Sequence, residues 1–130
     1  MRYTLLALSS PSDGQCLLTA ARVATALIHK GHELNTVFFS DAATAIGLVT
    51  LRMPQDEISV QRLWQSLADE HGVELVLCVA SAMQRGVLSA DNVASDSELH
   101  HSLAEGFRIG GLGQLIAATH AADRVLTFGG

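Results

Sequence analysis

The sequence predicts a three-layer α/β domain built on a mostly parallel five-stranded sheet. Short apolar runs alternate along the chain with stretches whose apolar residues recur at helical spacing, and this alternation is typical of βαβ units. The run from Val73 to Ala80 is almost unbroken in its apolar character, as expected of a parallel strand covered on both faces. With 130 residues, of which 48% are hydrophobic, the chain can bury one core, so we expect a single domain over residues 1–130.

The first half of the chain is expected to form two strands and two helices. Turn-forming residues and glycines bound each of these segments. The expected elements are, in order, a strand at 3–8, a turn at 9–14, a helix at 17–28 closed by His29-Lys30-Gly31, a strand at 34–39, a partly helical stretch at 40–51, a loop at 52–56 and an amphipathic helix from Val60 that ends at Gly72.

The second half begins with the apolar strand and then turns polar for almost twenty residues. Residues 87–105 form this polar stretch, and Ser95-Asp96-Ser97-Glu98 within it reads as a capping box for a short helix. Stretches this long in a compact domain are usually functional or mobile. A short strand at 107–109, a helix at 112–119 and a last strand at 124–128 complete the expected set.

Five strands joined by helices suit a flavodoxin-like sheet with the strand order 2-1-3-4-5. In that order the winding reverses between the first and third strands, and ligands bind in the crevice at their carboxyl ends. Cys78 stands at the carboxyl end of the third expected strand. The predicted topology therefore places this thiol at the crevice.

Cys78 also marks the point where the strand gives way to small residues that tolerate a helix. The free N–H groups and positive partial charge of a helix start lower the pKa of a thiol, which makes it a nucleophile or a sulfur carrier. Groups that would stabilise the anion are the N–H groups of Val79, Ala80 and Ser81 and the side chain of Arg85. Two alternatives stay open: Cys78 as a small core hydrophobe, and Arg85 as a solvated surface side chain.

Composition restricts the class of protein and the class of partner. The net charge of −5 argues against direct binding of nucleic acid, and no apolar run approaches the ~20 residues that a membrane helix requires. Charged residues make up only 16% of the chain, which favours an apolar surface buried against partner subunits. Two cysteines and no visible signal peptide indicate thiols kept reduced in the cytoplasm.

The remaining motifs carry weaker signals. The loop at 9–14 could hold an anion, although simple turn chemistry explains it better, and Cys16 is either a resolving thiol or a space-filling residue. Gly110-Gly111-Leu112-Gly113 lacks the spacing of a dinucleotide-binding loop. The six histidines form no recognisable ligand set and no serine-hydrolase elbow exists, so we expect neither a metal nor another cofactor.

Three segments, in order and at matching spacing, resemble the DsrE/TusD family of sulfurtransferase subunits nearly end to end. They are Lys30-Gly31-His32-Glu33-Leu34-Asn35-Thr36-Val37-Phe38-Phe39; Leu63-Trp64 through His71-Gly72-Val73 to Cys78-Val79-Ala80 and Arg85-Gly86-Val87; and Gly106-Phe107 through Gly111-Leu112-Gly113 to Asp123-Arg124-Val125. Cys16 and the loop at 9–14 depart from the family pattern. These departures leave the region of the first strand less defined and do not affect the segment around Cys78.

The resemblance implies a DsrE-like fold in which the cysteine matching Cys78 carries sulfur as a persulfide. It also implies a heterohexamer with TusB-like and TusC-like subunits, or with DsrH-like and DsrF-like ones. A TusA-like donor would supply the sulfur. A TusE-like acceptor would take it toward 2-thiolation of the tRNA wobble uridine, whereas DsrE-type proteins move sulfur in dissimilatory sulfur oxidation.

Two further functions stay open beside sulfur transfer. The chain could be a non-catalytic assembly subunit in which Cys78 only packs, or a small-molecule binder that uses the loop at 9–14 as an anion site. In the sulfur-transfer hypothesis the stretch at 87–105 would shield the persulfide from water or admit a partner protein.

Overall fold

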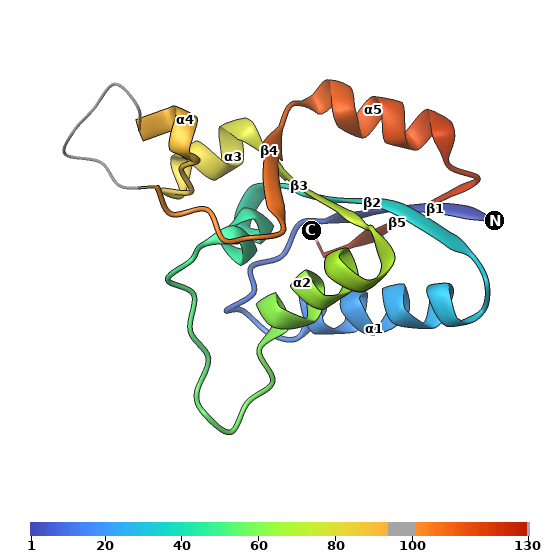
Figure 1. Ribbon diagram of the computed structural model, residues 1–130, viewed down its shortest axis with the longest axis horizontal. Helices are drawn as coiled ribbons and strands as arrows, with labels where there is room; N and C mark the ends of the chain where they lie inside the picture. The colour runs from blue at the N-terminus through green and yellow to red at the C-terminus, as the bar shows by residue number, and fades with distance from the viewer. Residues whose placement is uncertain (94–100, 130) are drawn as a thin grey trace.

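The computed structural model describes residues 1–93 and 101–129, and these form a parallel sheet between two layers of helices (Figure 1). The strands are β1 (Arg2–Ala7), β2 (Glu33–Phe39), β3 (Glu74–Cys78), β4 (Phe107–Gly110) and β5 (Arg124–Phe128). The helices are α1 (Cys16–His29), the 3-10 helix η1 (Asp41–Gly47), α2 (Val60–His71), α3 (Val79–Gln84), α4 (Ala90–Val93) and α5 (Leu112–Ala121). The predicted fold class is confirmed, and each expected element lies within a few residues of its predicted place. The expected capping box at 95–98 lies outside the described residues.

The order of the strands differs from the prediction. The sheet runs β4-β3-β2-β1-β5, with every pair parallel, instead of 2-1-3-4-5. Each of β2, β3 and β4 pairs with the strand before it in sequence, and only β5 returns across the sheet to pair with β1. The winding therefore reverses between β1 and β5, and β2 separates β1 from β3. The first and third strands are therefore not neighbours, and the prediction of a ligand-binding crevice between them, with Cys78 beside it, was wrong.

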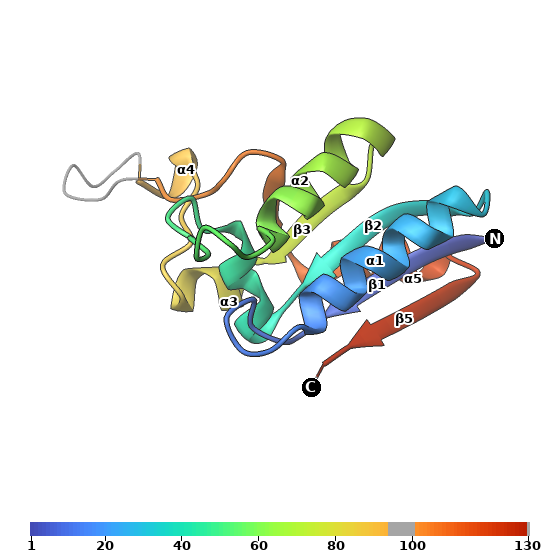
Figure 2. The same cartoon turned by 90° about the horizontal axis from the view of Figure 1, so that it is seen from below.

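The same connectivity places the helices in two layers. Right-handed crossovers that move one way along a sheet put their helices on one face, and a crossover that moves the other way puts its helix on the opposite face. Figures 1 and 2 show α1 and α2 together on one face and α5 alone on the other. None of the described helices is both long and apolar enough to cross a membrane.

The larger part of the core lies between the sheet and the two helices α1 and α2. It combines one side of the strands with the buried sides of these helices, and Trp64 and Phe39 meet there edge to face at 5.4 Å between ring centroids. Ser59 caps the start of α2 by accepting a hydrogen bond from the amide of Arg62. Gly72 ends the helix in a left-handed conformation, with φ of 67°, which a glycine adopts without steric cost.

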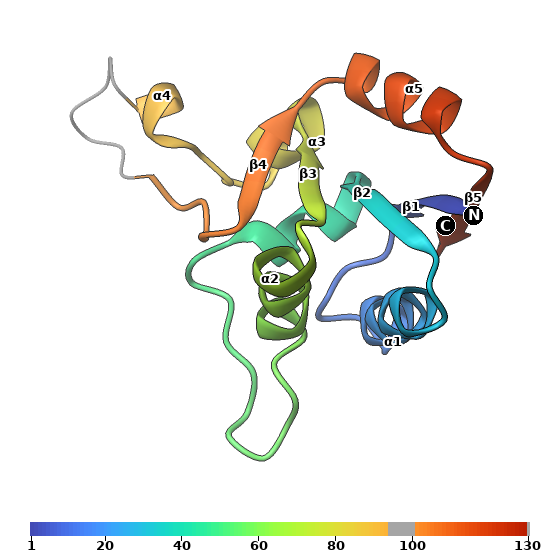
Figure 3. The ribbon, with the colours of Figure 1, turned by 45° about the vertical axis from the view of Figure 1, so that its right-hand side comes forward.

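The α5 layer is thin by comparison. None of the residues of α5 is fully buried, and its apolar Leu112 and Ile116 are 61% and 59% exposed. Figure 3 shows this helix above β1 and β2, on the side of the sheet opposite to α1 and α2, with no other element drawn over it. The predicted helix exists, but half of its apolar pattern faces outward.

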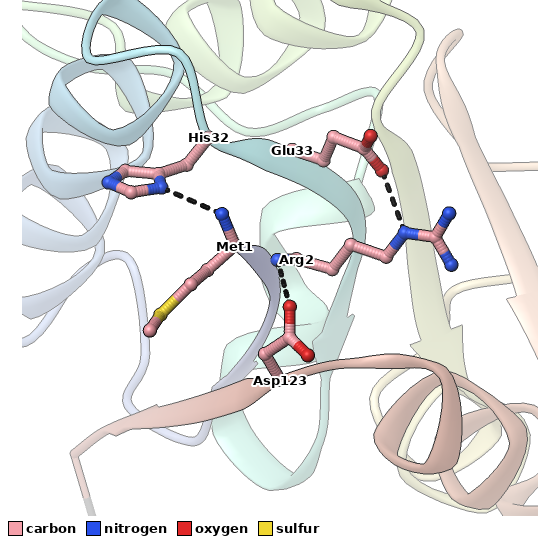
Figure 4. A network of polar contacts seen from close by, with 5 residues as sticks. All are labelled: Met1, Arg2, His32, Glu33 and Asp123. Atoms are coloured by element: carbon pink, nitrogen blue, oxygen red, sulfur yellow. Dashed lines mark hydrogen bonds and ion pairs between the residues drawn. The ribbon is translucent and has the colours of Figure 1, made fainter.

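The amino ends of β1 and β2 are held by polar contacts (Figure 4). The Arg2 side chain pairs with Glu33 at 3.0 Å, and the Arg2 amide donates to the Asp123 carboxylate at 2.8 Å. The amino terminus lies 3.1 Å from Nδ1 of His32. These contacts fix the start of β1 against its two neighbouring strands, at the end of the sheet opposite to Cys78.

Candidate functional site

Cys78 is the last residue of β3 and immediately precedes α3, as the sequence predicted. The apolar run that precedes it is buried on both faces of the sheet, because β2 and β4 flank β3 and helices cover it. The Cys78 side chain packs on the α5 side with Phe38 and Val76, while the next two residues, Val79 and Ala80, are exposed. The residue as a whole is 7% exposed, so it lies at the margin of the core.

The surroundings of this thiol favour its ionised form. Desolvation by burial raises the pKa of Cys78, but hydrogen bonds from the backbone and hydroxyl of Ser81, the Ser40 hydroxyl and the backbone of Ala80 lower it by more. The pKa therefore lies below that of an ordinary thiol. Among the described residues, the Cys78 side chain does not cap the start of α3 by a hydrogen bond of its own.

The strands β2 and β3 and the helix α3 bring these donors together. Phe39 of β2 pairs in register with Leu77 of β3, so the next residues, Ser40 and Cys78, lie side by side at the carboxyl ends of the two strands. Ser81 lies in the first turn of α3 and is 8% exposed. Its hydroxyl oxygen accepts a hydrogen bond of 3.0 Å from the backbone amide of Asp41, the first residue of η1.

The four groups predicted to stabilise the anion differ in their placement. The backbones of Ala80 and Ser81 contribute to the lowered pKa of Cys78, together with the Ser81 hydroxyl. Val79 directs its side chain outward and is 39% exposed. Arg85 is exposed, and its Nη1 donates to the carbonyl oxygen of Ser81 at 3.3 Å, which places the guanidinium along α3.

Ser40 and Asp41 were missed by the sequence analysis. Neither belongs to a motif, and their position beside Cys78 depends on the pairing of β2 with β3. A turn signal after the apolar run at 34–39 would have been the only clue, because Ser and Asp commonly follow strands in turns.

The other candidate residues lie away from Cys78. Cys16 begins α1, after β1, and is half-buried; both cysteines are free thiols. The loop at 9–14 lies at the carboxyl ends of β1 and β5, where the winding reverses, and the amide of Ser12 donates to Oγ of Ser10 within it. This loop, rather than Cys78, therefore lies at the topological switch point of the observed sheet.

Gly110 has a packing role, as predicted for a tight turn that leads into a closely packed helix. A Cβ atom at this position would overlap Oε1 of Gln114 and would lie 2.8 Å from Cγ1 of Val76. Gly111 then precedes α5 in an extended conformation. Gly110 accordingly lets the Gln114 side chain of α5 and Val76 of β3 pack against the end of β4.

Cys78 lies at the margin of the core, and two hollows of the structure lie away from it. A groove of about 750 Å³ is lined by residues such as Glu74, Arg108 and Asp69, which puts it at the amino end of β3. A second hollow of about 280 Å³ lies between α1 and α2. A thiol at a margin suits exchange with a sulfur atom presented by another protein.

Comparisons with known proteins identify the family of the chain. The model of the DsrE/DsrF-like family matches residues 1–128. A sulfurtransferase TusD homolog of Vibrio vulnificus strain YJ016 is 42% identical over 128 residues, which cover 98% of both chains. The TusD homolog of Haemophilus influenzae is 41% identical over 98% of this chain and 99% of its own, and the sulfurtransferase TusD of Photorhabdus laumondii is 36% identical over 98% of both.

A solved structure shares the fold. The crystal structure of the ychN protein from E. coli superposes with a TM-score of 0.78 at 26% identity, covering 98% of this chain and 99% of that one. The parallel sheet, the thiol at the end of β3 and a family match over nearly the whole chain lead to one assignment. The chain belongs to the DsrE/DsrF-like family, and its relatives within that family include sulfurtransferases of the TusD type.

Proposed function

We propose that this chain is a sulfurtransferase subunit that accepts sulfur as a persulfide on Cys78 and passes it to an acceptor protein. The observation that carries the proposal is the lowered pKa of this thiol at the carboxyl end of β3. A larger thiolate fraction at neutral pH speeds thiol–sulfur exchange. The similarity to TusD-type sulfurtransferases over 98% of the chain supports the same activity.

The transfer consists of two exchanges in which atoms and electrons balance. The Cys78 thiolate attacks the terminal sulfur of a donor persulfide; the new S–S bond forms as the old one breaks, and the donor leaves as a thiolate. Cys78 then carries the terminal sulfur, which an acceptor thiolate removes in the same way. No external oxidant or reductant takes part.

The proposed relay is that of the TusD type, with a TusA-like donor, a TusE-like acceptor and 2-thiolation of the tRNA wobble uridine as its end. The cytoplasm, where thiols stay reduced, is its proposed location. A DsrE-type role in dissimilatory sulfur oxidation would use the same exchanges with other partners. Transfer of labelled sulfur from the loaded protein to a TusE-like acceptor distinguishes the two roles, since failure with this acceptor would favour the second.

The exposed apolar residues of α5 support assembly with related subunits into a heterohexamer. Leu112 and Ile116 lie on this helix, and Met83 on α3 is 56% exposed near the same end of the sheet. Apolar surface of this kind is typical of subunit interfaces. In this proposal residues 1–130 form one sulfur-carrier domain of the assembly.

Sulfur loading tests the central proposal. The protein is incubated with a persulfide donor, and its intact mass is measured before and after treatment with a reductant. We expect a reversible gain of one sulfur atom that Cys78→Ser abolishes and that the matched variant Cys16→Ser retains. No gain, or a gain that survives Cys78→Ser, would contradict the proposal.

A non-catalytic assembly role is the second candidate, favoured by the small exposure of Cys78. In that role the thiol would only fill space against Phe38 and Val76. Slow alkylation of Cys78 at neutral pH in the assembled complex, combined with normal assembly, would support this role over sulfur transfer.

A further inference from the structure

Asp41 adopts a backbone conformation that is unusual for its residue type. Its φ is 51°, and it is the only non-glycine residue of the described ranges with a positive φ. The left-handed region is sterically unfavourable for residues with a Cβ atom, and such conformations persist where surrounding contacts hold them. The Asp41 side chain is exposed, so the contacts that hold the turn come from the backbone.

Both polar groups of the Asp41 backbone have buried side chains as partners. The amide donates to Oγ of Ser81 at 3.0 Å, and the carbonyl oxygen accepts from Oγ1 of Thr44 at 2.8 Å. Thr44 is fully buried. The turn therefore aims the amide of Asp41 at the hydroxyl of Ser81 and is held in that orientation by Thr44.

This contact fixes the role of the Ser81 hydroxyl. A backbone amide can only donate, so the Ser81 oxygen is an acceptor toward Asp41, and its own hydrogen is left for another acceptor. Ser81 is three residues after Cys78 on the first turn of α3, and Ser40 adjoins Cys78 through the register of β2 and β3. The hydroxyls of Ser81 and Ser40 are therefore both neighbours of the Cys78 sulfur.

We propose that the left-handed turn at Asp41 fixes the Ser81 hydroxyl as a hydrogen-bond donor to the Cys78 sulfur, and that Ser81 and Ser40 are positioning residues that favour the anionic sulfur. Hydrogen bonds arranged in series polarise one another in a site largely removed from water. The series runs from the Asp41 amide through the Ser81 hydroxyl to the sulfur. It serves a thiolate and a persulfide anion alike, since each hydroxyl has one hydrogen to donate to the anionic sulfur.

The inference rests on the proposed function, because it concerns the anionic sulfur that the transfer requires. The lowered pKa of Cys78, to which the hydroxyls of Ser81 and Ser40 both contribute, agrees with it. The position of the turn is further secured by η1, since Gln61 donates to the carbonyl oxygens of Ile46 and Leu48 at 2.8 and 2.7 Å.

The first test measures the pH dependence of alkylation of Cys78 by iodoacetamide in a Cys16→Ser background. Removal of the hydroxyl by Ser81→Ala is expected to raise the midpoint by about one pH unit, which makes alkylation at neutral pH about tenfold slower. Ser81→Thr, which keeps a hydroxyl, should restore most of the shift. Thr4→Val is the control, because it removes a buried hydroxyl that donates to Ala118 and should leave the midpoint unchanged.

The second test uses a matched pair of substitutions at Asp41. Asp41→Gly and Asp41→Val both remove the carboxylate, but only glycine adopts a positive φ without cost, whereas a β-branched residue strongly disfavours it. We expect Asp41→Gly to keep the parent midpoint or lower it, and Asp41→Val to raise it. Fluorescence of Trp64, the only tryptophan of the chain, reports whether each variant is folded.

Separate readouts distinguish failure of this inference from failure of the proposed function. An unchanged midpoint in Ser81→Ala, or equal midpoints in the two Asp41 variants, would overturn the inference even if Cys78 takes up sulfur. A protein that takes up no sulfur but shows the expected midpoint shifts would overturn the proposed function alone. If Ser81→Ala does not fold, the comparison between the two Asp41 variants decides.

Discussion

A single methyl group added at Gly47 should destabilise the protein by a predictable amount. Gly47 ends η1 and is buried against β3, and a Cβ atom on it would overlap Cδ1 of Leu77 and lie 3.4 Å from its Cγ. Leu77 is fully buried, so its side chain has no free space into which it can turn. Overpacking of this kind costs about 1–3 kcal/mol of unfolding free energy.

The assay is urea unfolding followed by the fluorescence of Trp64, which is fully buried in the native protein. With a denaturant slope of about 2 kcal/mol per molar urea, Gly47→Ala should lower the midpoint by roughly 0.5–1.5 M. The slope itself should not change, because the surface exposed on unfolding is nearly the same.

Gly113→Ala is the matched control, since the same methyl group is added where it meets nothing. Gly113 lies in α5, its added Cβ would have no atom within 4 Å, and alanine favours the helix by up to about 1 kcal/mol. Its midpoint should stay constant or rise. A Gly47→Ala midpoint equal to or above that of the parent would refute the described packing of η1 on β3.

Three further predictions concern other contacts. Alkylation of Cys78 in a Cys16→Ser background should show a pH midpoint below the ~8.5 of a free thiol. Because the pKa of Cys78 is lower in the folded than in the unfolded protein, the ionised thiol stabilises the fold fully above the unfolded-state pKa, and this stabilisation is lost as pH falls through the folded-state pKa. Unfolding free energies measured over a pH series, compared with those of Cys78→Ser, would check this. Gln61→Ala should cost about 1–3 kcal/mol in urea unfolding, because two carbonyls at the end of η1 lose their donor. Arg2→Ala should cost less than about 1 kcal/mol by the same assay, because its ion pair with Glu33 is more than half exposed, and a larger loss would contradict this view.

Local structure was predictable from the sequence because local patterns determine it. The helix from Cys16 to His29 has an apolar side that repeats every three to four residues and a glycine just beyond its end, and the observed bounds match the predicted ones closely. The position of Cys78 at the end of an apolar strand was confirmed for the same reason. The family resemblance added the nature of the chemistry, which the residue pattern had left open.

The strand order was not predictable in the same way, because it depends on which neighbour each strand selects. The run of four buried residues that ends β2 at Phe39 is explained by its central place between β1 and β3. The partly exposed β5 occupies an edge. Both patterns are also compatible with other orders, so only the folded sheet distinguishes them.

The contribution of Ser40 to the surroundings of Cys78 depends on the strand order, so it could not be predicted while the order was unknown. Ser40 lies beside the thiol only because β2 pairs with β3, and no local signal announces the positive φ of Asp41. Asp enters the left-handed region more readily than most residues, but it does so in only a small fraction of cases.

The contacts at the amino ends of β1 and β2 have a practical consequence for engineering. All five strands are parallel, so their amino ends share one edge of the sheet and their carboxyl ends share the other. The polar network of Arg2, Glu33 and Asp123 lies at the first of these edges, and the sulfur of Cys78 lies at the second. Changes to one end need not propagate to the other, since additivity holds for sites far apart. Mutations that strengthen the amino end can thus raise the stability of the scaffold and compensate for destabilising substitutions introduced around the thiol.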